Sequence, residues 1–115
     1  MRSLETDRIL PAREKELLVR CKKAVAAIDP TAQVILYGSR ARGEEHPDSD
    51  YYLLIITNGP ATLTVEDQYR RQLYPLELET GAVLTVILTR RSDWNSTLFS
   101  AMPLYQNIRR EGIQL

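Results

Sequence analysis

A glycine-serine turn is the first place in this sequence where residue types and spacing could do chemistry. Gly38 follows the short apolar segment 33–37, and Ser39 comes directly after the glycine. Glycine lets the backbone approach a ligand closely, and a short helix beginning at Ser39 would turn its free N–H groups toward an anion. Arg40 and Arg42 can add charged donors to phosphate oxygens. The turn is therefore a candidate phosphate-binding site; an ordinary turn with two solvated arginines is the simpler alternative.

An acid follows this turn at the head of an apolar stretch. Ten residues separate Ser39 from Asp50, which opens the mostly apolar segment 50–57. Residues 50 and 52 of a strand lie on the same face, so two acids there could bind a divalent cation opposite the turn. The second position holds Tyr52 instead of an acid. Asp48 and Asp50 form an alternative Asp-x-Asp pair, which would require the site to be shifted by two residues.

The apolar pattern predicts alternating helices and strands that would position these residues. Apolar residues recur every three or four positions between 11 and 28, and the segment 50–57 is apolar on both faces, as in a covered central strand. In chain order the expected elements are a helix over 11–28, a strand over 33–37, a short helix from Ser39, a strand over 50–57, a helix capped by Thr64, a strand over 82–89, a helical piece near 92–98 and a helix from Pro103 to Gly112. This order predicts an α/β domain, or α+β if the sheet is mixed.

Three residues define the expected helix between the last two predicted strands. Thr64 is the predicted N-cap, and Asp67 is placed as the distant member of a capping box. Pro75 should break or restart this helix, because proline lacks the N–H that the helix needs.

Bulk composition limits the classes of function. The 115 residues suffice for one modest core, so we expect a single domain over 1–115. Fifteen basic and fifteen acidic residues cancel, so no overall field favours nucleic acid or an anionic membrane. The single cysteine, Cys21, excludes an internal disulfide, and the N-terminal residues lack a signal-peptide pattern. Apolar runs are far shorter than the roughly 20 residues that span a bilayer, so we expect a soluble, cytoplasmic protein.

Four segments together resemble a known family. The sequence “GSRARG” followed by “PDSDYYLLI” is similar to the signature of the minimal nucleotidyltransferases of the DNA polymerase β superfamily, glycine-serine, ten residues, then Asp-x-Asp. The segments “TVILTRRSDW” and “MPLYQNIRREGIQL” are similar to that family's third strand and closing helix. The resemblance covers roughly residues 15–115. It implies a small mixed sheet flanked by helices.

The resemblance also implies roles for individual residues. In this family the turn, here Gly38 and Ser39, binds nucleotide phosphates, and three carboxylates hold two Mg²⁺ ions for nucleotidyl transfer. Asp50 matches the first carboxylate. The second falls on Tyr52, and the third falls on Thr85 or a neighbour in a strand without acids.

The missing acids decide how much of the chemistry we expect. Asp50 and a bound nucleoside triphosphate such as ATP could retain one weakly held Mg²⁺, because this ion is commonly bound by one or two carboxylates plus substrate phosphates. A second ion would have little to hold it. The loss of one ion from a two-metal site removes several kcal/mol of transition-state stabilisation, or orders of magnitude in rate.

Two functions remain as hypotheses. One is an active Mg²⁺-dependent nucleotidyltransferase that moves AMP from ATP to a protein or small-molecule acceptor. The other, favoured by the number of acids, is a degenerate member that binds a partner; the resemblance implies an antitoxin-like role beside a small helical HEPN-type protein. We expect either that partner or a homo-oligomer to cover an apolar rim formed by Tyr51, Tyr52, Trp94 and Leu98.

Overall fold

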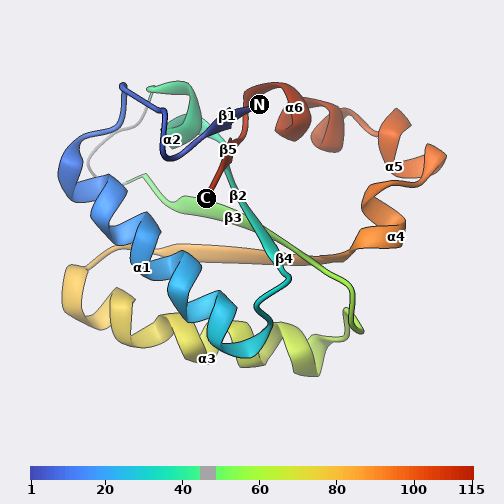
Figure 1. Cartoon of the computed structure of the whole chain (residues 1–115), viewed down its shortest axis with the longest axis horizontal. Helices are drawn as coiled ribbons and strands as arrows, with labels where there is room; N and C mark the ends of the chain where they lie inside the picture. The colour runs from blue at the N-terminus through green and yellow to red at the C-terminus, as the bar shows by residue number, and fades with distance from the viewer. Residues whose placement is uncertain (45–48) are drawn as a thin grey trace.

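A mixed β-sheet covered by helices on both faces organises the part of the chain that the computed structural model describes, residues 1–44 and 49–115 (Figure 1). The helices α1 and α3 cover one face, and α4 and α6 pack against the other. In chain order the elements are β1 (Arg2–Ser3), α1 (Ala12–Ile28), β2 (Gln33–Tyr37), α2 (Ser39–Arg42), β3 (Tyr51–Thr57), α3 (Leu63–Thr80), β4 (Leu84–Arg90), α4 (Arg91–Trp94), α5 (Thr97–Ala101), α6 (Pro103–Glu111) and β5 (Ile113–Gln114).

The strands lie in the order β1-β5-β2-β3-β4. The strand β2 is antiparallel to both β3 and β5, whereas β3 and β4 are parallel, as are β1 and β5. The sheet is therefore mixed, and the expected α+β architecture is confirmed. The end of β2 and the start of β3 lie at the same end of the sheet, because these neighbours run in opposite directions.

The central strand β3 separates two apolar cores. Its odd-numbered residues Tyr51, Leu53 and Ile55 belong to the core beneath α1 and α3. Leu54 and Ile56 belong to the second core, which also contains Trp94 and Ile108 from α4 and α6. The four residues 53–56 have no exposed surface, so the prediction of a central strand covered on both faces is confirmed.

The helix α3 begins earlier than expected. Its N-cap is Thr62, whose side chain accepts a hydrogen bond from the N–H of Val65 at 3.2 Å. Thr64 therefore lies inside the helix, and the prediction that it caps the helix with Asp67 is wrong. Both threonines offer a capping hydroxyl. The earlier start adds residues to the hydrogen-bonded helix, as in the bond from the N–H of Glu66 to the carbonyl of Thr62 at 2.9 Å.

Pro75 does not break this helix, contrary to the prediction. It lies within α3, which continues to Thr80 and ends at Gly81 with a φ of 75°. Tyr69, Leu73 and Leu76 are buried against the rest of the fold on both sides of the proline. Their burial outweighs the one backbone hydrogen bond that proline cannot make.

The C-terminal third also differs from the prediction. The helical piece expected near 92–98 is two short helices, α4 and α5, because Ser96 caps the second one and accepts a hydrogen bond from the N–H of Phe99. The helix α6 begins at Pro103 and ends at Gly112 as predicted. The strands β1 and β5 were not predicted; each has only two residues, too few to show an apolar period.

Side chains of α3 cover the exposed edge of β4. The N–H of Leu84 donates to Glu77 at 2.9 Å and the N–H of Leu88 donates to Glu66 at 3.3 Å. Arg70 donates to the carbonyl oxygen of Val86 at 3.4 Å. Occupied backbone groups and charged side chains disfavour pairing of this edge with another strand.

Two further observations bear on the predicted class of protein. Among the described residues, no helix has both the length and the apolar character needed to cross a bilayer. Cys21 is fully buried in α1, and burial raises the pKa of its thiol to about 12. The neutral, inaccessible thiol therefore serves as a core residue.

Candidate functional site

The glycine-serine turn joins β2 to α2. Gly38 has a φ of 86°, a conformation that side-chain-bearing residues rarely adopt, and its carbonyl oxygen accepts the N–H groups of Ala41 at 3.1 Å and Arg42 at 3.2 Å. The helix α2 begins at Ser39 and ends at Gly43, which has a φ of 73°. The two glycines thus permit a tight helical turn between the end of β2 and the chain that leads to β3.

Sheet register brings the positions of the two missing acids together. Tyr52 of β3 lies opposite Thr85 of the parallel strand β4 and opposite Tyr37 of the antiparallel strand β2. Residues directly opposite each other in neighbouring strands share a face of the sheet. Tyr37, Tyr52 and Thr85 therefore form one row across three strands, on the face that packs against α4 and α6.

Asp50 lies at the same end of the sheet as the turn. It precedes β3, and the neighbouring N–H of Tyr51 donates to the carbonyl of Val83 at 2.8 Å, which continues the contact between β3 and the chain leading into β4. Nε of Arg40 donates to the carbonyl of Ser49 at 2.9 Å and ties α2 to this segment. The expected proximity of Gly38–Ser39 and Asp50 is thus supported by the contacts. Asp48, the alternative carboxylate, lies outside the described residues.

The ring of Tyr52 packs against the turn. A Cβ added to Gly38 would lie 3.2 Å from Cδ2 of Tyr52, and the ring centroids of Tyr37 and Tyr52 are 5.6 Å apart. Tyr52 keeps 36% of its surface exposed. The space beside the glycine, which the sequence predicted for a phosphate, is therefore bordered closely by an aromatic ring.

A family model described as “Nucleotidyltransferase domain” matches residues 18–109, a span that includes the turn, Asp50 and β4. This chain belongs to the nucleotidyltransferase domain family. The resemblance inferred from the sequence motifs is thereby confirmed. A comparison with curated proteins found no match.

The donor set of this nucleotidyltransferase domain does not fit a pair of magnesium ions. Magnesium prefers oxygen ligands with octahedral geometry and is usually held through carboxylates. Of the three positions expected to carry acids, only Asp50 has a carboxylate, whereas Tyr52 and Thr85 have uncharged hydroxyls. Within residues 1–44 and 49–115, no three side chains of His, Cys, Asp or Glu gather closely enough to hold a metal ion.

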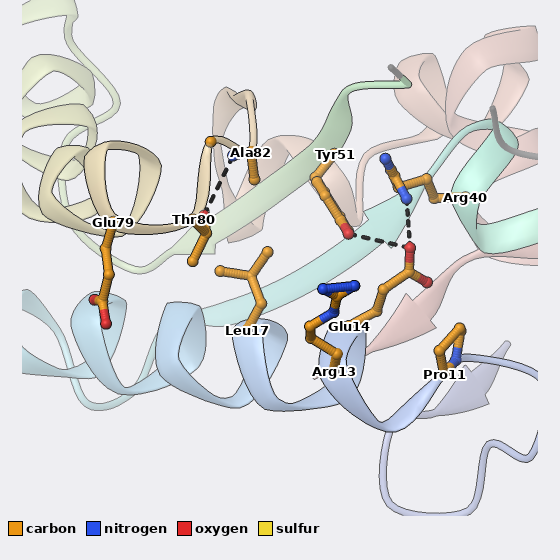
Figure 2. Close-up of a pocket in the computed structure, with 10 residues that line it drawn as sticks. Pro11, Arg13, Glu14, Leu17, Arg40, Tyr51, Glu79, Thr80 and Ala82 are labelled. Atoms are coloured by element: carbon orange, nitrogen blue, oxygen red, sulfur yellow. Dashed lines mark hydrogen bonds and ion pairs between the residues drawn. The ribbon is translucent and has the colours of Figure 1, made fainter. Parts of the chain in front are cut away.

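Arg40 has a different environment from the one predicted for a phosphate ligand. Its guanidinium is buried, forms an ion pair with Glu14 of α1, and stacks over the ring of Tyr51 at 4.0 Å from the centroid. Figure 2 shows this cluster, in which the hydroxyl of Tyr51 also donates to Glu14 at 3.2 Å. Tyr51 faces the core beneath α1, on the side of the sheet opposite Tyr52. The geometry favours a structural role for Arg40 over the predicted contact with phosphate.

Arg42 is also paired with carboxylates of the domain. Its Nε lies 3.2 Å from Glu44, and its Nη1 lies 3.4 Å from Glu111 at the end of α6. The side chain is 40% exposed, so it could still reach a solvent anion by leaving these partners. Both arginines of α2 thus have their charges compensated within the domain.

A pocket that no sequence motif marks lies on the other face of the sheet. A pocket of about 820 Å³ lies between the first turns of α1 and the end of α3, with the Glu14, Arg40 and Tyr51 cluster in its wall (Figure 2). Glu14 comes from an amphipathic helix and no motif marks it in the sequence. A smaller pocket of about 380 Å³ lies beside β4 and is lined by Thr89, Phe99 and other residues.

Two tyrosines that flank the turn and the start of β3 have altered acidity. Burial raises the pKa of Tyr37 to about 12, with smaller contributions from Tyr52 and Tyr105. Burial also raises the pKa of Tyr51 to about 12, and the negative charge of Glu14 adds to this effect. Both phenols therefore keep their protons well above the usual tyrosine pKa near 10.

The raised pKa values of Tyr37 and Tyr51 predict a loss of stability at alkaline pH. Between about pH 10 and pH 12 the unfolded chain has released these protons and the native domain has not, so the free energy of unfolding falls as pH rises. Titration of phenolate absorbance should show a late phase that Tyr37→Phe and Tyr51→Phe each reduce. The exposed Tyr74→Phe serves as the control and should remove amplitude near pH 10. A single transition near pH 10 for every tyrosine would contradict this prediction.

Proposed function

We propose that this domain is a degenerate nucleotidyltransferase, weak or inactive as an enzyme, that acts as an antitoxin-like partner of a helical HEPN-type protein. The observation that carries the proposal is the pairing of Tyr52 with Thr85 across β3 and β4. Of the three positions where the family resemblance implies a carboxylate, the second and third have neutral side chains, and these two are neighbours in the sheet. The proposed loss therefore affects two adjacent ligand positions and leaves only Asp50.

The electrostatics of the turn support weak binding of a nucleotide. The ring of Tyr52 contacts Gly38, and both arginines of α2 pair with carboxylates. A triphosphate would have to displace the ring and compete with these ion pairs without two metal ions to neutralise its charge. Phosphoryl transfer depends chiefly on such electrostatic stabilisation and on positioning.

An apolar rim with fewer members than expected supports a role in protein binding. Tyr51 and Trp94 are buried, so their expected place in an exposed rim is wrong; both are packing residues of the two cores. Tyr52 remains 36% exposed and Leu98 of α5 is 70% exposed. Met102, between α5 and α6, is 40% exposed and extends the apolar surface near Leu98 along the chain.

The partner role predicts a defined assembly. Light scattering of the purified chain should show a mass above the 13.2 kDa of one chain, or a pull-down from its native cells should recover a small helical protein in a fixed ratio. Leu98→Glu with Met102→Glu should abolish this assembly, because charges would be buried in the contact. Leu78→Glu on α3 is the matched control, since Leu78 is 68% exposed on a different helix. A monomer with no partner would contradict the proposed role.

An active transferase remains the second candidate, supported by the retained Gly38, Ser39 and Asp50. This alternative predicts that the chain transfers AMP from labelled ATP to a protein or small acceptor in the presence of Mg²⁺. The activity should disappear in Asp50→Ala. Labelling that survives this substitution would argue against catalysis at this site.

A further inference from the structure

The surface around Asp50 and Tyr52 has the features of a site for a cationic side chain. This inference rests on the proposed binding function and concerns what the altered site binds. Asp50 directly precedes β3, and the hydrogen bond from the N–H of Tyr51 to the carbonyl of Val83 continues the contact with the chain before β4, so alternation places the side chains of Asp50 and Tyr52 on one face. Asp50 is half-buried, and in the described part of the chain no hydrogen bond or ion pair involves its carboxylate.

Tyr52 offers an aromatic surface held in position by its surroundings. One side of the ring contacts the turn at Gly38, and the ring of Tyr37 lies 5.6 Å away with an interplanar angle of 39°. Tyr37 itself is only 9% exposed, so this support is firm. A partly exposed ring that is already packed loses little conformational entropy when a ligand stacks on it.

The opposite face of β3 already shows what such a pair of side chains binds. There the guanidinium of Arg40 stacks at 4.0 Å on the ring of Tyr51 and pairs with the carboxylate of Glu14. Tyr51 and Tyr52 are consecutive, so they present their rings on opposite faces of the same strand. Asp50 would take beside Tyr52 the part that Glu14 takes beside Tyr51. The difference is that, among the described residues, no hydrogen bond or ion pair joins an arginine to the carboxylate of Asp50.

The charge of the surroundings favours a cation from outside the domain. Arg42, the exposed arginine of α2, already pairs with Glu44 and Glu111. Neither of these ion pairs involves Asp50, whose carboxylate has no hydrogen bond or ion pair among residues 1–44 and 49–115. A guanidinium suits this site better than an ammonium, because it is planar, less strongly hydrated, and can stack on a ring while it pairs with a carboxylate.

We propose that Asp50 and Tyr52 together receive an arginine side chain of a partner protein, with the guanidinium stacked on the ring of Tyr52 and paired with the carboxylate of Asp50. The aromatic residue that replaces an expected metal ligand thus becomes part of a protein-binding site. Thr85 lies opposite Tyr52 in β4, on the same face of the sheet, and would add a hydroxyl to this site.

Nuclear magnetic resonance of the full chain tests this proposal with N-acetyl-arginine amide as the probe and N-acetyl-lysine amide at equal ionic strength as its match. The arginine probe should shift the amide signals of Asp50, Tyr52 and Thr85, and it should bind about two- to fivefold more tightly than the lysine probe. Asp50→Asn and Tyr52→Leu should each weaken arginine binding by a similar factor. Equal shifts with both probes, or arginine binding unchanged in Asp50→Asn, would overturn the proposal.

Controls separate this proposal from the function on which it rests. Glu16→Gln and Tyr74→Leu remove an exposed carboxylate and an exposed ring elsewhere, and arginine binding should not change in either. The same samples are titrated with Mg²⁺ and ATP. Tight binding of ATP at Asp50 would contradict the proposed function, whereas weak ATP binding together with no response to arginine would refute the arginine site alone.

Discussion

Replacement of Gly112 by alanine is expected to lower the free energy of unfolding by about 3 kcal/mol, the upper end for overpacking of a filled interior. An added Cβ would lie 2.6 Å from the carbonyl oxygen of Ile108 and 2.6 Å from Cγ2 of Ile35. The backbone itself is not the reason, because the φ of Gly112 is −67°. The requirement for glycine is spatial: the chain turns here from α6 into β5, directly against β2.

Urea denaturation measures this effect, with Gly59→Ala as the matched control. A Cβ at Gly59 would have its nearest neighbour at 3.6 Å, an ordinary contact, and its φ is not positive. We expect this control to change stability by less than about 0.5 kcal/mol. Equal stability of the two variants would show that the end of α6 is not packed against β2 as described.

Removal of the Glu14 carboxylate is expected to have an effect of similar size. In Glu14→Ala the guanidinium of Arg40, with a side chain only 7% exposed, loses the ion pair with Glu14 while it remains buried. Breaking a buried pair in this way costs about 3 kcal/mol or more. The ring of Tyr51 and the carbonyl of Ser49 continue to contact Arg40 and limit the loss of stability.

A double substitution tests whether the loss of stability comes from breaking the ion pair between Glu14 and Arg40. Glu14→Leu combined with Arg40→Met should recover most of the stability lost in Glu14→Ala, because well-packed apolar side chains often replace a buried ion pair without loss. The exposed pair between Arg20 and Glu79 is the control, and Glu79→Ala should affect stability much less. If Glu14→Ala and Glu79→Ala had the same small effect on stability, Arg40 would not be buried as the structure describes.

The parts of the fold that the sequence predicted are those governed by local rules. The strand over 50–57 was recognisable from its continuous apolar residues, and the turn at Gly38 from the residue type that a positive φ requires. The helix α6 was bounded correctly by Pro103 and Gly112. The same local rules failed at Pro75, because the apolar residues around it stabilise α3 through contacts distant in sequence.

The residues of the candidate site could be predicted from the sequence, but their arrangement in space could not. Motif spacing identified Asp50 and Tyr52, and the family resemblance implied Thr85 or a neighbour, but only the sheet register shows that Tyr52 and Thr85 are adjacent. Arg40 and Arg42 looked equivalent in the sequence. The structure separates them, because α2 directs Arg40 into a buried pair with a residue of α1, 26 positions away. Nothing in the local sequence predicts that contact.

Calorimetric titration of the full chain with ATP in the presence of Mg²⁺ tests the degenerate site most directly. We expect weak or absent binding by the natural chain. Tyr52→Asp together with Thr85→Asp restores two carboxylates and should strengthen metal binding. The single change Tyr52→Asp shows whether the third acid is needed. Submicromolar binding of ATP by the natural chain, lost in Asp50→Ala, would contradict it.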